Sequence, residues 1–166
     1  MAVTSADNLH GIIFWIMGSL DEGNRSLIGW TLLSGLLILV VSYLFVQPLN
    51  ALRLGEEKAR HLGINTQNTI RVIFILASLL AGVSVAIAGV IGFVGLIIPH
   101  VLRIIFGSDY RILLVGSFLT GGAFVVLCDL VARIIIAPNE LPIGVITGLV
   151  GGLIFIFLMR QKMQKI

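Results

Sequence analysis

The stretch Gly89–Arg103, GVIGFVGLIIPHVLR, decides how the rest of the chain is interpreted. It lies in an apolar region, residues 70–106, whose only charged residues are Arg71 and Arg103. A single helix of that length would reach roughly 55 Å, nearly twice a hydrocarbon core of about 30 Å. Three glycines and a proline interrupt the region: Gly89, Gly92, Gly95 and Pro99. We therefore predict a structural reversal here that joins two membrane crossings.

The composition favours an integral membrane protein over a soluble domain. Of 166 residues, 58% are hydrophobic and only 11% are charged, which is too few charges to cover a soluble surface. The net charge of +3 does not indicate a nucleic-acid partner, because the Lys and Arg residues lie in short loops beside apolar runs. The single cysteine, Cys128, excludes an internal disulfide.

The hydropathy pattern predicts one all-α transmembrane domain over residues 1–166. Five crossings are expected at about 30–47, 70–89, 93–106, 112–136 and 141–159. Residues 7–20 are too short to span, and we expect an external interfacial helix there, followed by a polar loop over 21–29. The polar segment 49–69 carries a short amphipathic helix between Gly55 and Gly63, and 137–142 form a turn.

The distribution of Lys and Arg predicts the orientation of these crossings. A cytoplasmic C-terminus places nine of the eleven on the inside: Arg53, Lys58, Arg60, Arg71, Arg103, Arg111, Arg160, Lys162 and Lys165. Only Arg25 and Arg133 then face outside, so the positive-inside rule favours this orientation. The 49–69 segment is therefore expected in the cytoplasm and the reversal outside.

Few residues carry chemistry of their own. The sequence contains no Gly-Lys-Ser/Thr phosphate loop, no metal-ligand spacing and no catalytic grouping, so we expect no enzyme, no metal and no bound cofactor. Asp129 and Arg133 are spaced to pair on one helix face, either to let the helix end near the interface or to present Arg133 to an acidic partner. His100 is expected to be a packing residue.

Two patterns suggest contacts with other helices. Gly144, Gly148 and Gly152 form a ridge of small residues that lets a second helix approach closely, in this chain or another subunit. In the polar segment, Ala59 and Leu62 are three apart and are expected on one face, which is either a solvated surface or one that lies in the groove of a soluble partner.

Taken together, the motifs resemble the FecCD-type permeases, the membrane subunits of ABC importers for iron–siderophore complexes, haem and cobalamin. The matching segments, in order, are FWIMGSL from Phe14, the loop Leu52–Gly63, Gly89–Arg103, Asp109-Tyr110-Arg111, Asp129–Arg133 and ELPIGVIT from Glu140. The family's subunits are about twice as long and have ten crossings. The chain therefore resembles a C-terminal half, and Met1 resembles an internal methionine or a fragment boundary.

The resemblance implies roles for these residues. An ATPase-coupling helix would comprise Gly55, Glu56, Glu57, Ala59, Arg60, Leu62 and Gly63. Arg133 would receive an acidic residue of a periplasmic or lipid-anchored substrate-binding protein, and the Gly144–Gly152 span would lie near the two-fold axis, along the pathway and beside a second permease copy. ATP and Mg²⁺ would be bound by a separate ATPase subunit.

The implied function is ATP-driven alternating access in a prokaryotic inner membrane, surrounded by lipid and joined by the missing N-terminal half. The alternative is a truncated fragment that does not transport, or an assembly partner of a split permease. A self-contained secondary transporter is disfavoured, because Asp129 is the only acidic residue within a predicted span and lies near its end.

Overall fold

The computed structural model describes residues 16–21, 23–135 and 141–163, and all regular secondary structure within them is α-helical. This confirms the predicted all-α class. Most of the predicted interfacial helix 7–20 and of the turn 137–142 lies outside the described residues. The helices are α2 (Arg25–Leu44), α3 (Val46–Leu52), α4 (Glu56–His61), α5 (Thr66–Ala88), α6 (Val94–Phe106), α7 (Tyr110–Ile135) and α8 (Ile143–Met163).

Helices α2, α5 and α7 are long and apolar enough to cross a membrane. Within the described residues, α6 and the apolar part of α8, Ile143–Phe157, are shorter than a full crossing. Large apolar side chains are exposed along α2, α5 and α7, as expected where lipid or other helices replace water. Hydroxyl groups on these helices bond to carbonyls of the preceding turn, as Thr31 does to Leu27 and Ser84 to Leu80.

The segment before α2 corrects the prediction of a polar loop over 21–29. The Asn24 side chain accepts hydrogen bonds from the backbone N–H groups of Ser26 and Leu27, so the helix begins at Arg25 instead of Trp30. The Asn24 cap, which lies inside a polar run, thus starts the helix five residues before the predicted apolar span begins.

The far end of this crossing also differs from the expectation. Pro48 cannot donate a hydrogen bond and its ring would clash with the carbonyl of Leu44, which is the last residue of α2. The chain turns at Phe45 and resumes as α3, with Pro48 in the first helical turn, where proline is tolerated. Helix α3 was not expected from the sequence.

The reversal between α5 and α6 uses two residues with positive φ. Gly89 ends α5 at φ 68°, and Phe93 precedes α6 at φ 66°. Phe93 is the one non-glycine residue with positive φ in the described part of the chain, whereas Gly92 and Gly95 have no close neighbours at their Cα positions. The glycine spacing therefore located the reversal, but its left-handed turn into α6 is made by an aromatic residue.

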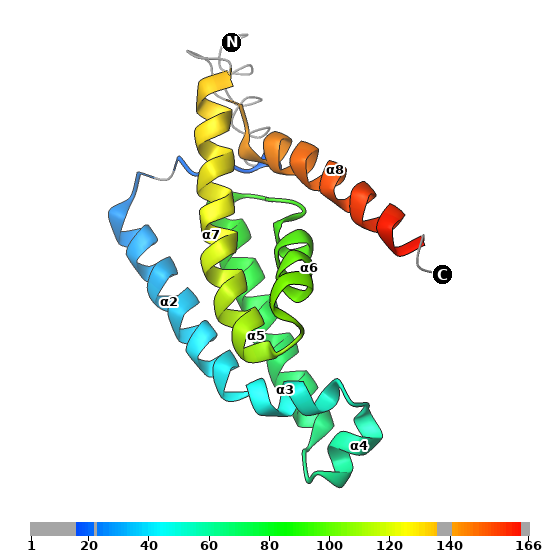
Figure 1. Ribbon diagram of the computed structural model, residues 1–166. Helices are drawn as coiled ribbons and strands as arrows, with labels where there is room; N and C mark the ends of the chain where they lie inside the picture. Colours follow the sequence, from blue (N-terminus) through cyan, green and yellow to red (C-terminus); the bar gives the residue numbers. More distant parts are fainter. Residues whose placement is uncertain (1–15, 22, 136–140, 164–166) are drawn as a thin grey trace.

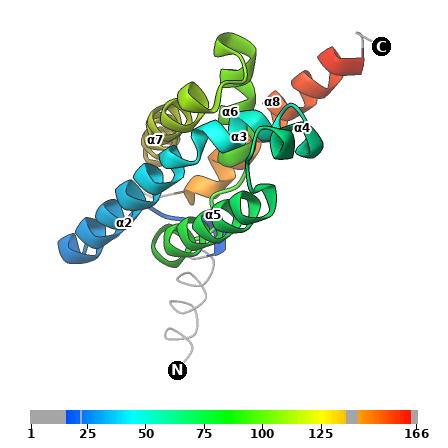
Figure 2. The same ribbon diagram turned by 90° about the horizontal axis from the view of Figure 1, so that it is seen from below.

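Helix α7 is the centre of the arrangement and packs against α2, α3, α6 and α8. Figure 1 shows α3 and α4 together at one end of the bundle, while α8 diverges from it. From below, α3 lies across the bundle and α4 lies to one side (Figure 2). Arg53, Lys58 and Arg60 lie in or beside α3 and α4, and Arg71, Arg103 and Arg111 lie on the turns of α5, α6 and α7 nearest that end. Arg25 and Arg133 lie at the opposite ends of α2 and α7.

Candidate functional site

The α3–α4 hairpin, residues 46–61, is the main polar feature of the described chain. Backbone hydrogen bonds from Leu54 to Ala51 and from Gly55 to Leu52 close a tight turn between the two helices. Gly55 has φ 106° and Gly63, after α4, has φ 79°. Residues other than glycine rarely adopt either backbone conformation. The two glycines therefore allow α4 to fold back against α3 and α5.

A three-residue network fixes α4 to the start of α5. Arg60 and Glu56 form an ion pair of 2.7 Å, and Thr66 donates to Glu56 Oε1 at 3.2 Å while accepting from Arg60 Nε at 3.2 Å. Thr66 is only 1% exposed, so its hydroxyl is the inner end of the network. The charged side chains are more than half exposed, and their pairing alone stabilises little.

The exposed surface of α4 differs from the one predicted. Ala59 is completely buried and Leu62 is 65% exposed, so the expectation that they share an outward face is wrong. The small side chain of Ala59 faces α3 and α5 and allows α4 to lie close to both helices. The outward surface instead combines Leu54 and Leu62 with the charged side chains of Glu57 and Lys58.

Helix α3 is joined to α7 by a side-chain contact that the sequence did not reveal. Asn50 Nδ2 donates to Asp109 Oδ1 at 2.8 Å, and Asn50 Oδ1 accepts from the backbone N–H of Tyr110 at 3.0 Å. The backbone N–H of Arg111 also donates to Asp109 Oδ1, at 2.9 Å. That backbone donor, followed by the Asn50 amide, lowers the pKa of Asp109 below its usual range, against a smaller opposing effect of burial.

At the opposite end of α7, Arg133 Nε donates to Asp129 Oδ2 at 2.9 Å. The Arg133 side chain is 40% exposed and that of Asp129 is 24% exposed. The guanidinium therefore carries a nearby counter-charge and still reaches the surface near the end of the helix.

Three segments that are distant in sequence meet in a close junction, which we call the glycine junction. Ser19 N–H donates to the carbonyl of Ala88 at 3.0 Å, and Ile143 N–H donates to the carbonyl of Gly18 at 3.2 Å. A Cβ at Gly144 would overlap the carbonyl of Met17, and a Cβ at Gly151 would overlap the Phe93 side chain. The junction thus joins the segment before α2, the reversal and the start of α8.

This geometry alters the interpretation of the glycine ridge on α8. Of the three predicted residues, only Gly144 is closely approached within the described chain, whereas Gly148 and Gly152 face open space. The residue that packs tightly is Gly151, which the ridge pattern did not include. A helix that is apolar on all sides gives no sequence signal for which of its faces is covered.

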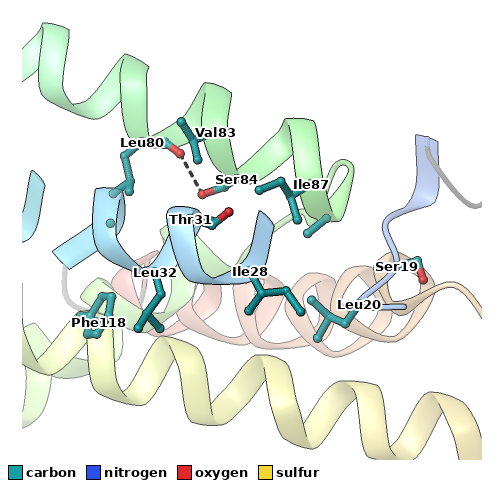
Figure 3. A pocket seen from close by; sticks show the side chains of 12 residues that line it. Ser19, Leu20, Ile28, Thr31, Leu32, Leu80, Val83, Ser84, Ile87 and Phe118 are labelled. Carbon is teal, nitrogen blue, oxygen red and sulfur yellow. Dashed lines mark hydrogen bonds between the residues drawn. The ribbon is translucent and has the colours of Figure 1, made fainter. Parts of the chain in front are cut away.

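A half-open pocket of about 430 Å³ lies between α2, α5 and α7 (Figure 3). Its lining is mainly apolar, with Leu32, Leu80 and Phe118 among the side chains. The Ser84 hydroxyl at its edge bonds to the Leu80 carbonyl. His100, expected to be packed, lies exposed on α6, and the described residues contain no metal-ligand cluster.

Comparison with known proteins places this architecture in a family. The FecCD transport family matches residues 1–161. The uncharacterised ABC transporter permease protein YvrB of Bacillus subtilis is 43% identical over 95% of this chain and 45% of its own length. The hemin transport system permease protein HmuU of Yersinia pestis is 37% identical over 98% and 49%. The vitamin B12 import system permease protein BtuC of Salmonella newport is 41% identical over 96% and 48%.

The fold agrees with this relationship. A solved structure of an ABC transporter assigned to the metal-chelate type, in an inward-facing conformation, superimposes with a TM-score of 0.81 at 35% identity. The match covers 92% of this chain and 49% of that one, so the chain spans about half the length of these relatives. The chain belongs to the FecCD transport family and is a multi-pass membrane protein.

Proposed function

We propose that this FecCD-family chain forms half of the membrane pathway of an ABC importer for iron–siderophore complexes or a related chelate such as haem or cobalamin. The observation that carries the proposal is the α3–α4 hairpin, a folded polar element at the end of the bundle where cationic residues gather. The importer would bind ATP and Mg²⁺ on a separate ATPase subunit that docks on this hairpin. Transport would proceed by alternating access in a prokaryotic inner membrane.

The segregation of charge supports a cytoplasmic location for the hairpin. Six of the nine Lys and Arg residues assigned to the inside lie on or beside α3 and α4, or on the adjoining turns of α5, α6 and α7. By the positive-inside rule, this distribution supports a cytoplasmic position for this end and for the C-terminus. Arg133 would face the outside, where its exposed guanidinium can receive a carboxylate of a substrate-binding protein.

The remaining contacts follow from surfaces that this chain leaves uncovered. Among the described residues, nothing lies within 4 Å of a Cβ built on Gly148 or Gly152, which supports a contact of α8 with a second permease copy, near the pathway. The exposed apolar faces of α2, α5 and α7 would meet lipid and a further half of the permease, since the chain covers only 49% of the length of HmuU.

The test is reconstitution of the complete complex with its ATPase. Glu57→Lys reverses a charge on the outward face of α4, and Gly63→Pro imposes a φ near −65° where the structure has 79°. Both variants are expected to abolish stimulation of ATP hydrolysis by loaded binding protein. Glu57→Asp and Gly63→Asn are the matched controls, since they keep the charge and tolerate the backbone conformation. Intact stimulation in both test variants would refute the docking site.

A second candidate is a split permease in which this chain acts only with a separately encoded N-terminal half, or a fragment that does not transport. The half-length coverage of the relatives favours considering it. Growth on defined iron chelates or cobalamin is measured with the chain expressed alone and together with the missing five crossings. This distinguishes transport by the chain alone, transport only by the two halves together, and no transport.

A further inference from the structure

Helix α4 is attached to the membrane helices by two separate polar routes. The first is the Glu56–Arg60–Thr66 network, which leads to the start of α5. The second passes through the short turn into α3 and then through Asn50 to the start of α7. The first route lies within one stretch of sequence, whereas the second joins residues about sixty positions apart.

The second route acts directly on the end of a helix. The Asp109 carbonyl accepts the first intrahelical hydrogen bond, from Leu113, so Asp109 is the N-cap of α7. The first N–H groups of a helix have no partner within it. Here Asn50 accepts from Tyr110 N–H and Asp109 accepts from Arg111 N–H. A residue of α3 therefore completes the cap of α7, and the start of α7 is held at a fixed place on α3.

A displacement applied at this cap would be carried far. Helix α7 is continuous over 26 residues, which span about 39 Å, and it ends beside Arg133 at the opposite end of the bundle. It packs against α2, α6 and α8 as well as α3. Helix α4, in contrast, packs mainly against α3 and α5. The most direct path of contacts from α4 to α7 therefore passes through α3.

We propose that Asn50 and Asp109 are positioning residues that transmit movement of the α3–α4 hairpin to α7, and through α7 to the opposite face of the membrane. The proposal rests on the function proposed above, because it assigns the link between ATPase docking at one end and binding-protein docking near Arg133 at the other. Such a link is a coupling free energy between two sites, and its loss separates their activities without removing either site.

The first test breaks the contact by charge. Asn50→Asp places a second carboxylate within hydrogen-bond distance of Asp109 and removes the amide donor between them. In the complete complex, we expect the ratio of binding-protein-stimulated to basal ATP hydrolysis to fall about fivefold or more. Asn65→Asp is the matched control. It makes the same chemical change at the same end of the bundle, in an N-cap whose side chain accepts from the backbone of its own helix, α5.

The second test restores the contact with its chemistry reversed. In Asn50→Asp/Asp109→Asn, the amide introduced at position 109 can donate to the carboxylate introduced at position 50. The carboxylate at position 50 keeps an oxygen to accept from Tyr110 N–H. Because Asp109 Oδ1 accepts from both Asn50 and Arg111 N–H in the wild type, the amide at position 109 must turn its nitrogen toward position 50 and its oxygen toward Arg111 N–H. We expect the ATPase ratio to return to within about twofold of the wild type, less than the lower limit of typical coupling effects. A residue that mattered only for local packing would not show this reciprocal rescue.

The outcomes separate this proposal from the function on which it rests. Failure of the wild-type complex to bind an ATPase subunit would refute the proposed function. A wild-type ratio in Asn50→Asp, or a reduced ratio that the reciprocal pair does not restore, would overturn the coupling role alone. If Asn50→Asp does not fold, Asn50→Ala removes both hydrogen bonds without adding a charge. Amide hydrogen exchange at Tyr110 in the purified chain then reports the contact directly: exchange must rise in Asn50→Ala, and an unchanged rate would overturn the proposal.

Discussion

The two ends of this molecule are held together by opposite means. At the hairpin end, helices are joined by side chains that bond to one another and to helix N-termini, as in the Asn50–Asp109 contact. At the glycine junction, segments are joined where side chains are missing, so that the backbone around Gly18 contacts the start of α8 directly.

The difference predicts how each end responds to change. A hydrogen bond between side chains can break and re-form, and water or a substituted polar group can replace one of its partners. The close approach of backbone segments at the glycine junction depends on the absence of a Cβ, and a single methyl group is enough to separate the segments. The hairpin end is therefore suited to rearrangement, and the junction is suited to holding three segments in one relative position.

The largest effect is expected for a methyl group added inside the junction. Gly144→Ala forces a Cβ against the Met17 carbonyl, a backbone atom that cannot rotate away. We expect a loss of about 2–3 kcal/mol in the free energy of unfolding, measured by SDS titration of the chain in mixed micelles. Gly148→Ala, one turn further along the same helix, meets open space and is the control, with no loss of stability. Equal stability of the two variants would contradict the junction.

A smaller effect is expected when the hairpin network loses its buried hydroxyl. Thr66→Val keeps the shape of the side chain but removes the hydrogen bonds to Glu56 and Arg60. The loss should be about 1 kcal/mol in the same titration, since the two charged partners can turn to water. Thr66→Ser retains the hydroxyl and should lose less. The opposite order of these two variants would show that packing, not the hydroxyl, matters at this position.

A still smaller change in stability is expected at the other end of α7. The Asp129–Arg133 pair is partly exposed, and Asp129→Asn should cost about 0.5 kcal/mol or less. Arg133→Gln should have a similarly small effect on unfolding while weakening association of the binding protein with the complete importer. A large loss of stability with unchanged association would instead assign Arg133 a purely structural role.

The smallest expected change in stability is the pH-dependent contribution of Asp109. The pKa of Asp109 lies below its ordinary value of 3.8 in the folded chain, so the folded state binds a proton less readily than the unfolded state. The resulting stability is fully present above about pH 4 and is lost as the pH falls through the lowered pKa. Asp109→Asn should therefore differ from the wild type at neutral pH by an amount that decreases below about pH 4. A difference that is constant with pH would contradict this assignment.

The helical class and the membrane character could be predicted because they depend on properties that add along the chain. The apolar runs around α5 and α7 are long enough to show in hydropathy alone, and the Asp129–Arg133 spacing identifies a pair within one helix. Helix α2 begins before its predicted start because Asn24 caps a helix within a polar run, and α3 follows a turn at Phe45 that hydropathy alone does not show.

The contacts between helices could not be predicted in the same way. The motif Asp109-Tyr110-Arg111 is visible in the sequence, but nothing local identifies Asn50 as its partner until the fold brings the two together. On α8, the choice between Gly148 and Gly151 depends on where Phe93 is placed by a reversal some fifty residues earlier. Burial of Ala59 likewise depends on neighbours outside α4.

The bond between Gly18 and Ile143 also has a consequence for the order in which the protein is assembled. Synthesis proceeds from the amino end, so the segment before α2 is made well before the residues of α8 that contact it. The helices from α2 to α7 can pack as they emerge, but the glycine junction closes only once α8 has been made. A contact of the segment before α2 thus forms later than the packing of the helices that follow it in the sequence.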